Sequence, residues 1–153
     1  MMNKVSSSEK RLTERHDIHA LQDLMMDLPD EDKFDIDALT QHFFAPGVYA
    51  RMFFIEAGSV VVGKIHKTEH LNIICKGKCS VSTEDGPLIL EGPRVVTSRP
   101  GIKKAVYAVE DTTWITIHVT DETDLDKIEE QVIAKDYAEL ENPRKEDLCL
   151  GEL

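Results

Sequence analysis

Residues 47–120 form a series of short apolar runs, each broken by glycine, proline or acidic residues. The runs are rich in the β-branched and aromatic residues that favour strands, and several alternate polar with apolar positions, as in the stretch GVYARMFFIEAG. Turn residues recur at intervals of about 8–12 residues, and no helical pattern lies between them. Many short strands without intervening helices indicate an all-β sandwich or barrel, so this segment predicts the core of the fold.

The two flanking segments have a helical period instead. Near the N-terminus, apolar residues recur at three- and four-residue spacing, at Ile18, Leu21, Met25 and Leu28. This spacing predicts an amphipathic helix over residues 15–28 that ends before a proline, and a second, short helical turn is expected over residues 36–42. After the β segment, apolar residues share one helical face and acidic residues occupy the first turn, which predicts a helix over residues 121–140.

The length of 153 residues and an apolar content of 41% indicate one domain with a real core. We expect an acidic, partly helical extension over residues 1–44, a barrel over residues 45–120, and a C-terminal helix with a tail over residues 121–153. The three cysteines are an odd number without metal-finger spacing, so Cys75 and Cys79 are interpreted as small strand residues rather than a redox pair.

The formal net charge of −11 disfavours non-specific binding to nucleic acid or to an anionic membrane surface. No apolar stretch approaches the roughly 18–20 residues that cross a bilayer. The first fifteen residues lack the apolar core and cleavage site of a secretory signal, so we expect a cytoplasmic protein that binds neither nucleic acid nor membrane.

One spacing within the β segment matches a known pattern. Gly58, Lys64, His66, His70 and Gly77 stand at the intervals of the first cupin motif, G-x5-H-x-H-x3-E-x6-G, and Pro100, Gly101, Lys104 and Ala108 follow the second motif less closely. Over about 60 residues the chain therefore resembles the cupin superfamily. It is also similar to small cupin-like proteins of tailed phages, through the stretches GKIHKTEHLNI and EDTTWITIH. The resemblance implies an all-β, cupin-type β-barrel or jelly roll with short N- and C-terminal helices, and a ligand pocket inside the barrel.

In metal-binding cupins, three histidines and a glutamate hold one divalent cation. Carried over position by position, the resemblance leaves His66 unchanged, places His70 at the glutamate, and places Lys64 and Lys104 at the other two histidines. An ammonium must lose its proton to bind a metal, which costs about 4–5 kcal/mol near neutral pH. We therefore predict a degenerate metal site and no cofactor. The alternative is a rebuilt divalent-metal site with His66 and His70 as ligands, completed by Glu69 or His118.

Two lysines and two imidazoles that face one cavity would suit an anion. On a regular strand Lys64 and His66 have the same parity, and His70 joins them if the intervening residues turn. We expect Lys64, His66, His70 and Lys104 to line a site for a phosphate or carboxylate, with Arg51 or Tyr49 as further donors.

Three functions remain open at this stage. The first is a protein that binds a small anionic ligand. The alternative to it is a pocket with a purely structural role, in which His118 is a structural histidine whose ring nitrogens are satisfied by hydrogen bonds. The second is a structural or interaction protein that forms a homo-oligomer, such as a homodimer, or joins a phage-associated assembly. The third is a divalent-metal-dependent cupin enzyme. The resemblance implies an oligomer in each case.

Overall fold

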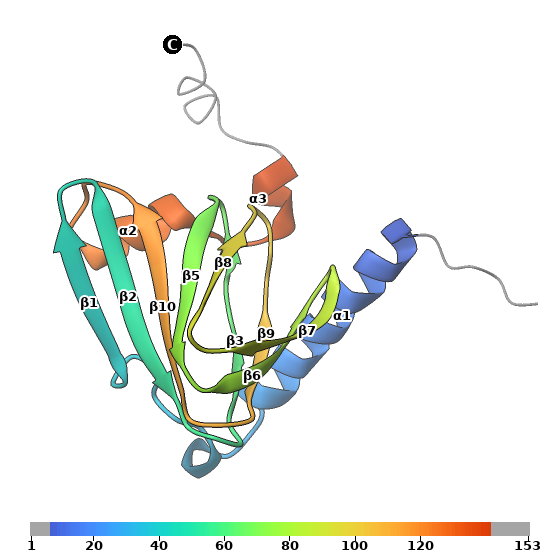
Figure 1. Ribbon diagram of the computed structural model, residues 1–153. Coiled ribbons are helices and arrows are strands. Elements are labelled where there is room, and N and C mark those ends of the chain that lie inside the picture. The colour runs from blue at the N-terminus through green and yellow to red at the C-terminus, as the bar shows by residue number, and fades with distance from the viewer. Residues whose placement is uncertain (1–6, 142–153) are drawn as a thin grey trace, which may run out of the picture.

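The computed structural model describes residues 7–141, which form two facing antiparallel sheets with helices at both ends (Figure 1). The five-stranded sheet has the order β1 (Thr40–Ala45), β2 (Val48–Ile55), β10 (Thr112–Val119), β5 (His70–Lys76) and β8 (Arg94–Ser98). The four-stranded sheet has the order β3 (Val60–Val62), β9 (Ala105–Ala108), β6 (Lys78–Thr83) and β7 (Gly86–Glu91). The predicted all-β barrel or jelly roll with helices at both ends is confirmed.

The inner face of each sheet follows from the alternation in the sequence. Every second residue of the buried strands points inward, and at one end of the barrel these residues are apolar. The resulting core consists of Ile55, Ile74, Cys79, Val81, Leu90, Val106, Ala108 and Trp114, all 6% exposed or less. Burying side chains of this size supplies the main driving force for closing the two sheets on each other.

The tight turns that end the strands depend on glycine at two positions. Gly77 joins β5 to β6 with φ of 96°, and a Cβ there would lie 2.2 Å from the carbonyl oxygen of Asp111. Gly58 precedes β3 with φ of 86°. These are the two glycines of the first motif, so their spacing reflects the turns that bracket β3, β4 and β5.

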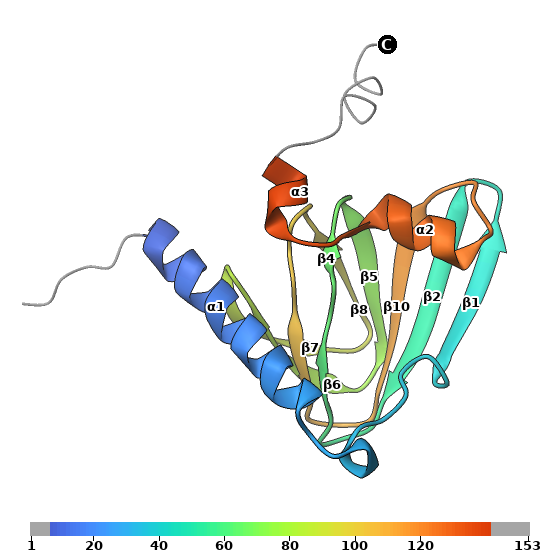
Figure 2. The same ribbon diagram turned by 180° about the vertical axis from the view of Figure 1, so that it is seen from behind.

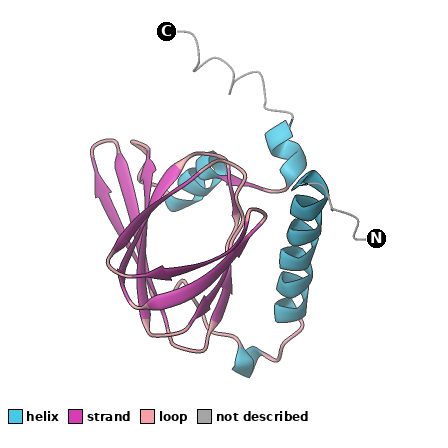
Figure 3. Cartoon of the chain, turned by 45° about the vertical axis from the view of Figure 1, so that its right-hand side comes forward, coloured by secondary structure: helices cyan, strands magenta, loops and turns pink. Residues whose placement is uncertain are grey.

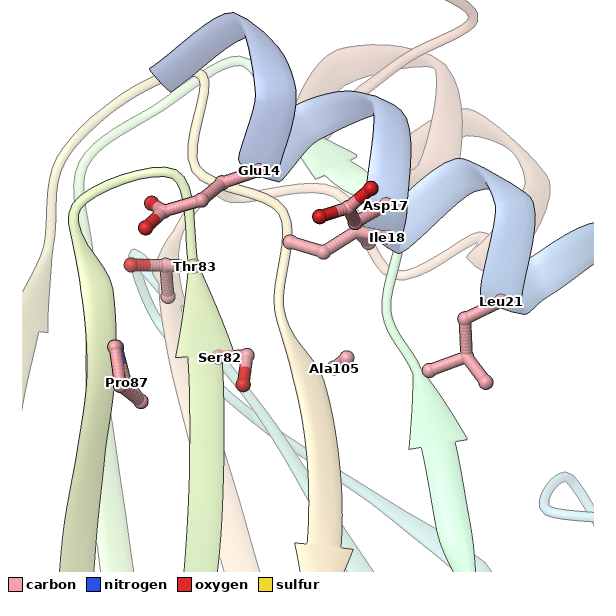
Figure 4. A pocket seen from close by; sticks show the side chains of 8 residues that line it. All are labelled: Glu14, Asp17, Ile18, Leu21, Ser82, Thr83, Pro87 and Ala105. Carbon is pink, nitrogen blue, oxygen red and sulfur yellow. The ribbon is translucent and has the colours of Figure 1, made fainter. Parts of the chain in front are cut away.

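The N-terminal helix α1 (Ser7–Met26) lies along the outer face of the four-stranded sheet (Figure 3). Two residues of α1 make the contact. Ile18 is buried, at 5% exposure, and Arg15 forms an ion pair with the buried Glu84 at the turn between β6 and β7. A groove remains between helix and sheet, where Ile18 and Leu21 face Ser82 and Ala105 (Figure 4). The predicted amphipathic helix is thus present, and it begins earlier and ends two residues sooner than expected.

The predicted helical turn over residues 36–42 is wrong in its second half. Backbone hydrogen bonds close turns only as far as Thr40, after a 3-10 turn, η1 (Asp30–Asp32). Thr40 then begins β1, which pairs with β2 along its whole length, so the strands start before residue 45. The pairing with β2 outweighs the local helical preference, and a partner strand is not visible in a local period.

The single helix predicted over residues 121–140 is also wrong. Its first part is α2 (Leu125–Val132), capped by Asp124, whose carboxylate accepts from the backbone N–H groups of Asp126 and Lys127. The chain then extends as β11 (Ile133–Ala134), which pairs with β4 (Ile65–His66), and α3 (Tyr137–Glu141) follows. The interruption attaches this segment to the strand that carries His66 (Figure 2). The tail from residue 142 lies outside the described residues.

No helix among residues 7–141 has both the length and the apolar character needed to span a lipid bilayer.

Candidate functional site

The barrel interior changes character along its strands. Beyond the apolar core, the inward positions of β2, β5, β10 and β8 become polar, and we call this region the polar end. Its inward side chains are Tyr49, Arg51, His70, Asn72, Ser98, Thr116 and His118, all buried except Arg51, which is half-buried. Register places them side by side, with Thr116 opposite both Arg51 and Asn72 and with His118 opposite Tyr49.

Asn72 forms the boundary between the two ends. Its side-chain oxygen accepts a hydrogen bond from Trp114 Nε1 at 3.1 Å, and its amide nitrogen donates to Ser98 Oγ at 2.8 Å. The Asn72 side chain is 1% exposed and forms one hydrogen bond with a residue of the apolar end and one with a residue of the polar end, so both of its polar atoms have partners. The sequence analysis did not single out Asn72 or Ser98, although Asn72 has the same strand parity as His70 and could have been found from it.

Three histidines from three strands meet at the polar end. The ring centroids lie 4.2 Å apart for His66 and His70, 4.9 Å for His70 and His118, and 5.4 Å for His66 and His118. His66 is held in β4 between β11 and the loop before β9, since its carbonyl oxygen accepts from the Gly101 N–H at 2.8 Å. The turn between His66 and His70 therefore brings the two rings together, as the motif spacing suggested.

Each of these rings has a buried nitrogen with no hydrogen-bond partner among the described residues. These atoms are Nδ1 of His66, Nε2 of His70 and Nδ1 of His118. His70 is oriented through its other nitrogen, because Nδ1 lies 3.1 Å from the Thr68 carbonyl oxygen, to which it donates. That bond leaves Nε2 as the unprotonated nitrogen in the neutral ring. The interpretation of His118 as a satisfied structural histidine is wrong for this reason.

The histidines are neutral near pH 7. Burial, with smaller effects from the neighbouring charges and rings, lowers the pKa of His66 from 6.5 to about 2 and the pKa of His118 to about 4. Burial also lowers the pKa of His70, against the opposing effect of its bond to Thr68. A buried, unpaired ring is less costly without charge, so the cluster presents three neutral imidazoles.

Lys104 lies beside this cluster, as the second motif suggested. Its carbonyl accepts from the Gly63 N–H at 2.8 Å, which fixes its backbone directly before β9. Burial lowers the pKa of Lys104 from 10.5 to about 8, and its charge contributes to the lowered pKa of all three rings. Within residues 7–141 no carboxylate forms an ion pair with Lys104. Arg51 is the second cation of the polar end, and its guanidinium lies 3.6 Å from the carboxylate of Asp37.

Lys64 lies apart from the cluster, contrary to the prediction. Its side chain is 62% exposed and its Nζ forms an ion pair with Glu129 of α2. The parity argument fails because the chain leaves regular strand between β3 and β4, so positions 64 and 66 are not on one continuous strand. The same helix closes the polar end, since Ile128 and Val132 pack on Tyr49, whose ring stacks 6.0 Å from that of His118.

The donor set fits the cupin metal site poorly in this conformation. No group of three His, Cys, Asp or Glu side chains among residues 7–141 has its atoms placed to hold a metal ion. Glu69, the suggested third ligand, is exposed at the surface. His118 is the better placed third imidazole, since its ring centroid lies 4.9 Å from that of His70 and 5.4 Å from that of His66.

The comparisons with known proteins give a distant likeness. No protein-family model matches the sequence, and no curated protein matches it significantly. Among solved structures, the chain is similar to a cupin superfamily protein of Desulfitobacterium hafniense, with 16% identity, a TM-score of 0.47, and coverage of 54% of this chain and 77% of that one. It is also similar to a cupin-2 domain containing protein of Shewanella frigidimarina, with 14% identity, a TM-score of 0.46, and coverage of 63% and 98%.

A third solved structure is the EutQ protein of Clostridium difficile, with 10% identity, a TM-score of 0.47, and coverage of 63% of this chain and 82% of that one. None of these three is described as a phage protein, and the likeness to phage proteins stays a prediction.

Proposed function

We propose that this protein binds a small anionic molecule, of the carboxylate or phosphate class, at the polar end of the barrel. The observation that carries the proposal is the set of three unpaired imidazole nitrogens next to a desolvated lysine without a carboxylate partner among the described residues. Unpaired buried polar groups cost stability, so each of them calls for a partner, and a bound ligand that contacts several of them at once would supply it.

The charge of the site favours an anion over a neutral or cationic ligand. Lys104 and Arg51 both lower the pKa of His66 and His118, and among the described residues Asp37 pairs with Arg51 at 3.6 Å while no carboxylate pairs with Lys104. An anion that contacts Lys104 would restore the charge interaction that burial removes. Neutral His66 and His118 can each donate an N–H from the free nitrogen to its remaining oxygens, whereas Nε2 of His70 accepts and would pair with a hydroxyl group of the ligand. The whole chain carries a net charge of −11, so this site is a local exception.

Calorimetric titration tests the proposal. We would titrate chelator-treated protein with inorganic phosphate, with succinate, and with a neutral diol of similar size. Lys104→Met should weaken binding of the anions at least tenfold, since a charged hydrogen bond of about 1.5–3 kcal/mol is lost. Lys64→Met is the matched control and should bind as the parent does, because Lys64 faces Glu129 at the surface.

Two results would count against the proposal. One is no anion binding at millimolar concentration, and the other is equal affinity for the neutral diol. Equal weakening in the Lys64 and Lys104 variants would place the anion elsewhere on the molecule.

The second candidate function is a divalent-metal centre, which the clustering of three neutral imidazoles favours. Unprotonated ring nitrogens are the form that binds a metal, and the bond from His70 Nδ1 to a backbone carbonyl is an orienting contact common in metal sites. When bound, the ion would supply Lewis-acid or redox chemistry, with His66, His70 and His118 as its ligands.

Metal analysis separates the two candidates. Protein purified without chelator should contain less than about a tenth of an equivalent of Fe, Mn, Ni, Cu or Zn if the site is for an anion alone. A full equivalent that disappears in His118→Ala, with correct folding by circular dichroism, would establish the metal centre instead.

A further inference from the structure

Lys103 is a buried lysine next to Lys104, in the segment that joins β8 to β9. It is 6% exposed, and the proposed anion site makes no use of it. Its Nζ donates to the side-chain oxygen of Gln22 in helix α1, which lies on the outer face of the four-stranded sheet (Figure 3). A buried ammonium group is costly, and its hydrogen bond here is to a neutral amide. The position of Lys103 under the helix therefore calls for an explanation.

The groups around the Lys103 ammonium belong to one face of α1. Burial and, to a smaller extent, the charge of Lys103 lower the pKa of His19. Burial also lowers the pKa of Lys103, against the opposing effect of Asp23. His19, Gln22 and Asp23 are three and four residues apart, so they share a helix face. The ring of His19 meets that of Tyr137 in α3 as well, with 5.7 Å between the ring centroids. Lys103 is therefore an anchor of α1 on the barrel.

The segment that carries Lys103 also belongs to the anion site. Its Gly101 N–H donates to the carbonyl oxygen of His66 at 2.8 Å, and the carbonyl oxygen of Lys104 accepts from the Gly63 N–H at 2.8 Å. Lys103 reaches α1, whereas the charge of its neighbour Lys104 acts on the three imidazoles of the polar end. A backbone shift at one of these lysines moves the other, because they share a peptide bond.

Helix α1 is packed loosely on the sheet. Among residues 14–26 only Ile18 is buried, while Leu24 and Met26 are 68% and 67% exposed. A groove of about 260 Å³ remains between helix and sheet, where Ile18 and Leu21 line it from the helix side (Figure 4). An element with few buried apolar contacts opens at a low cost in free energy. We therefore expect α1 to have a docked state, as described above, and a less populated undocked state.

We propose that α1 positions Lys104 for the anion through the hydrogen bond between Gln22 and Lys103, so that helix docking and anion binding favour each other. The inference rests on the proposed function, because it concerns the same site. Gln22 and Lys103 are positioning residues, since neither belongs to the polar end. In the undocked state Lys103 loses its acceptor, and the segment before β9 is released. By thermodynamic reciprocity, the anion stabilises the docked helix by the same factor.

Calorimetric titration of the full chain with inorganic phosphate tests the effect of the helix on the site. Gln22→Met keeps the length of the side chain and removes the acceptor, so phosphate binding should weaken by at least about fivefold, the lower end of usual coupling. Gln22→Glu restores an acceptor for the ammonium group and should recover the affinity of the parent. His16→Met is the matched control, because the His16 side chain is 82% exposed on the same helix, and it should leave the affinity unchanged.

Hydrogen exchange of the full chain measures the same link without any anion. In Gln22→Met, the amides of Gly63 and Gly101, which bond to the two ends of the link, should exchange at least about fivefold faster. The amides of β10 should keep their exchange rates. In the parent, saturating phosphate should slow exchange over residues 14–26, and Lys104→Met should abolish this slowing.

The failure of this inference differs from the failure of the proposed function. A parent chain that binds no phosphate overturns both. Phosphate binding of equal strength in Gln22→Met and the parent overturns the positioning role alone, and so does unchanged exchange of the Gly63 and Gly101 amides in that variant. Equal weakening in His16→Met, or a Gln22→Glu variant that binds as weakly as Gln22→Met, also overturns it, because the Gln22 acceptor would then not be the cause.

Discussion

The two ends of the barrel interior are built from the same strands and differ in how their polar atoms are satisfied. At one end, β5 and β10 contribute Ile74 and Trp114 to a dry core, and the one side-chain N–H there finds a partner in Asn72. At the other end, the same two strands contribute His70 and His118, each with a buried nitrogen that has no partner among the described residues.

The difference shows that burial alone does not decide what an interior position does. The apolar end is complete without a ligand, so its residues contribute directly to stability. The polar end carries the cost of unpaired groups and of a desolvated Lys104, and a ligand would offset that cost. The following changes test this contrast, from the largest expected effect to the smallest.

Trp114→Ala should destabilise the protein by about 3–5 kcal/mol, because it removes a large side chain that is 2% exposed and leaves the Asn72 oxygen without its donor. Urea unfolding followed by circular dichroism measures the effect. Leu88→Ala, at a residue 41% exposed on β7, should change the free energy of unfolding by less than about 1 kcal/mol. A loss below 1 kcal/mol for Trp114→Ala would mean that the apolar end is not the main core.

Acid should destabilise the protein through the polar end. The pKa of His118 is about 4 in the folded state and that of His66 about 2, while both are near 6.5 when unfolded. As pH falls from 6.5 to 4, the unfolded chain binds protons that the folded chain does not, so each histidine lowers the free energy of unfolding by up to about 1.4 kcal/mol per pH unit. His118→Gln should reduce the slope of stability against pH, and an unchanged slope would contradict the lowered pKa.

Replacement by phenylalanine should have opposite signs at the two ends. His118→Phe removes an unpaired buried nitrogen and keeps a ring against Tyr49, so we expect a gain of about 1–2 kcal/mol together with loss of anion binding. Trp114→Phe leaves the Asn72 oxygen unpaired and should cost about 1–3 kcal/mol. Thermal unfolding of both variants in one buffer gives the comparison. Destabilisation of similar size at both ends would show that the His118 nitrogen has a partner in solution.

Asp124→Ala should loosen the polar end alone. It removes the carboxylate that caps α2, which costs about 1 kcal/mol, or roughly a fivefold rise in local opening. Hydrogen exchange should quicken for the amides of α2 and stay unchanged for those of β10 near Trp114. Asp126→Ala is the control, because this neighbouring carboxylate does not cap the helix. Equally faster hydrogen exchange of the α2 amides in both variants would contradict the role of the Asp124 cap.

Much of the fold follows from local patterns. Alternation within strands predicted the barrel, and the motif glycines predicted turns that Gly58 and Gly77 form with positive φ. The spacing of His66 and His70 predicted their contact. The helical turn at residues 40–42 and the continuous C-terminal helix were wrong, because pairing with β2 and with β4 outweighs the local period in both places.

The sequence by itself determined the all-β barrel, its turns and the pairing of His66 with His70, because these depend on side-chain parity and on residues close in the chain. Only the tertiary structure decided that His118 completes the cluster and that Lys64 points away to Glu129. The position of His118 depends on the pairing of β10 with β5, which places it beside His70 although it lies 48 residues further along the chain. The position of Lys64 depends on the break between β3 and β4, which the sequence pattern does not predict. The lowered pKa values follow from the same placement, since desolvation is a property of the packed interior and not of a residue type.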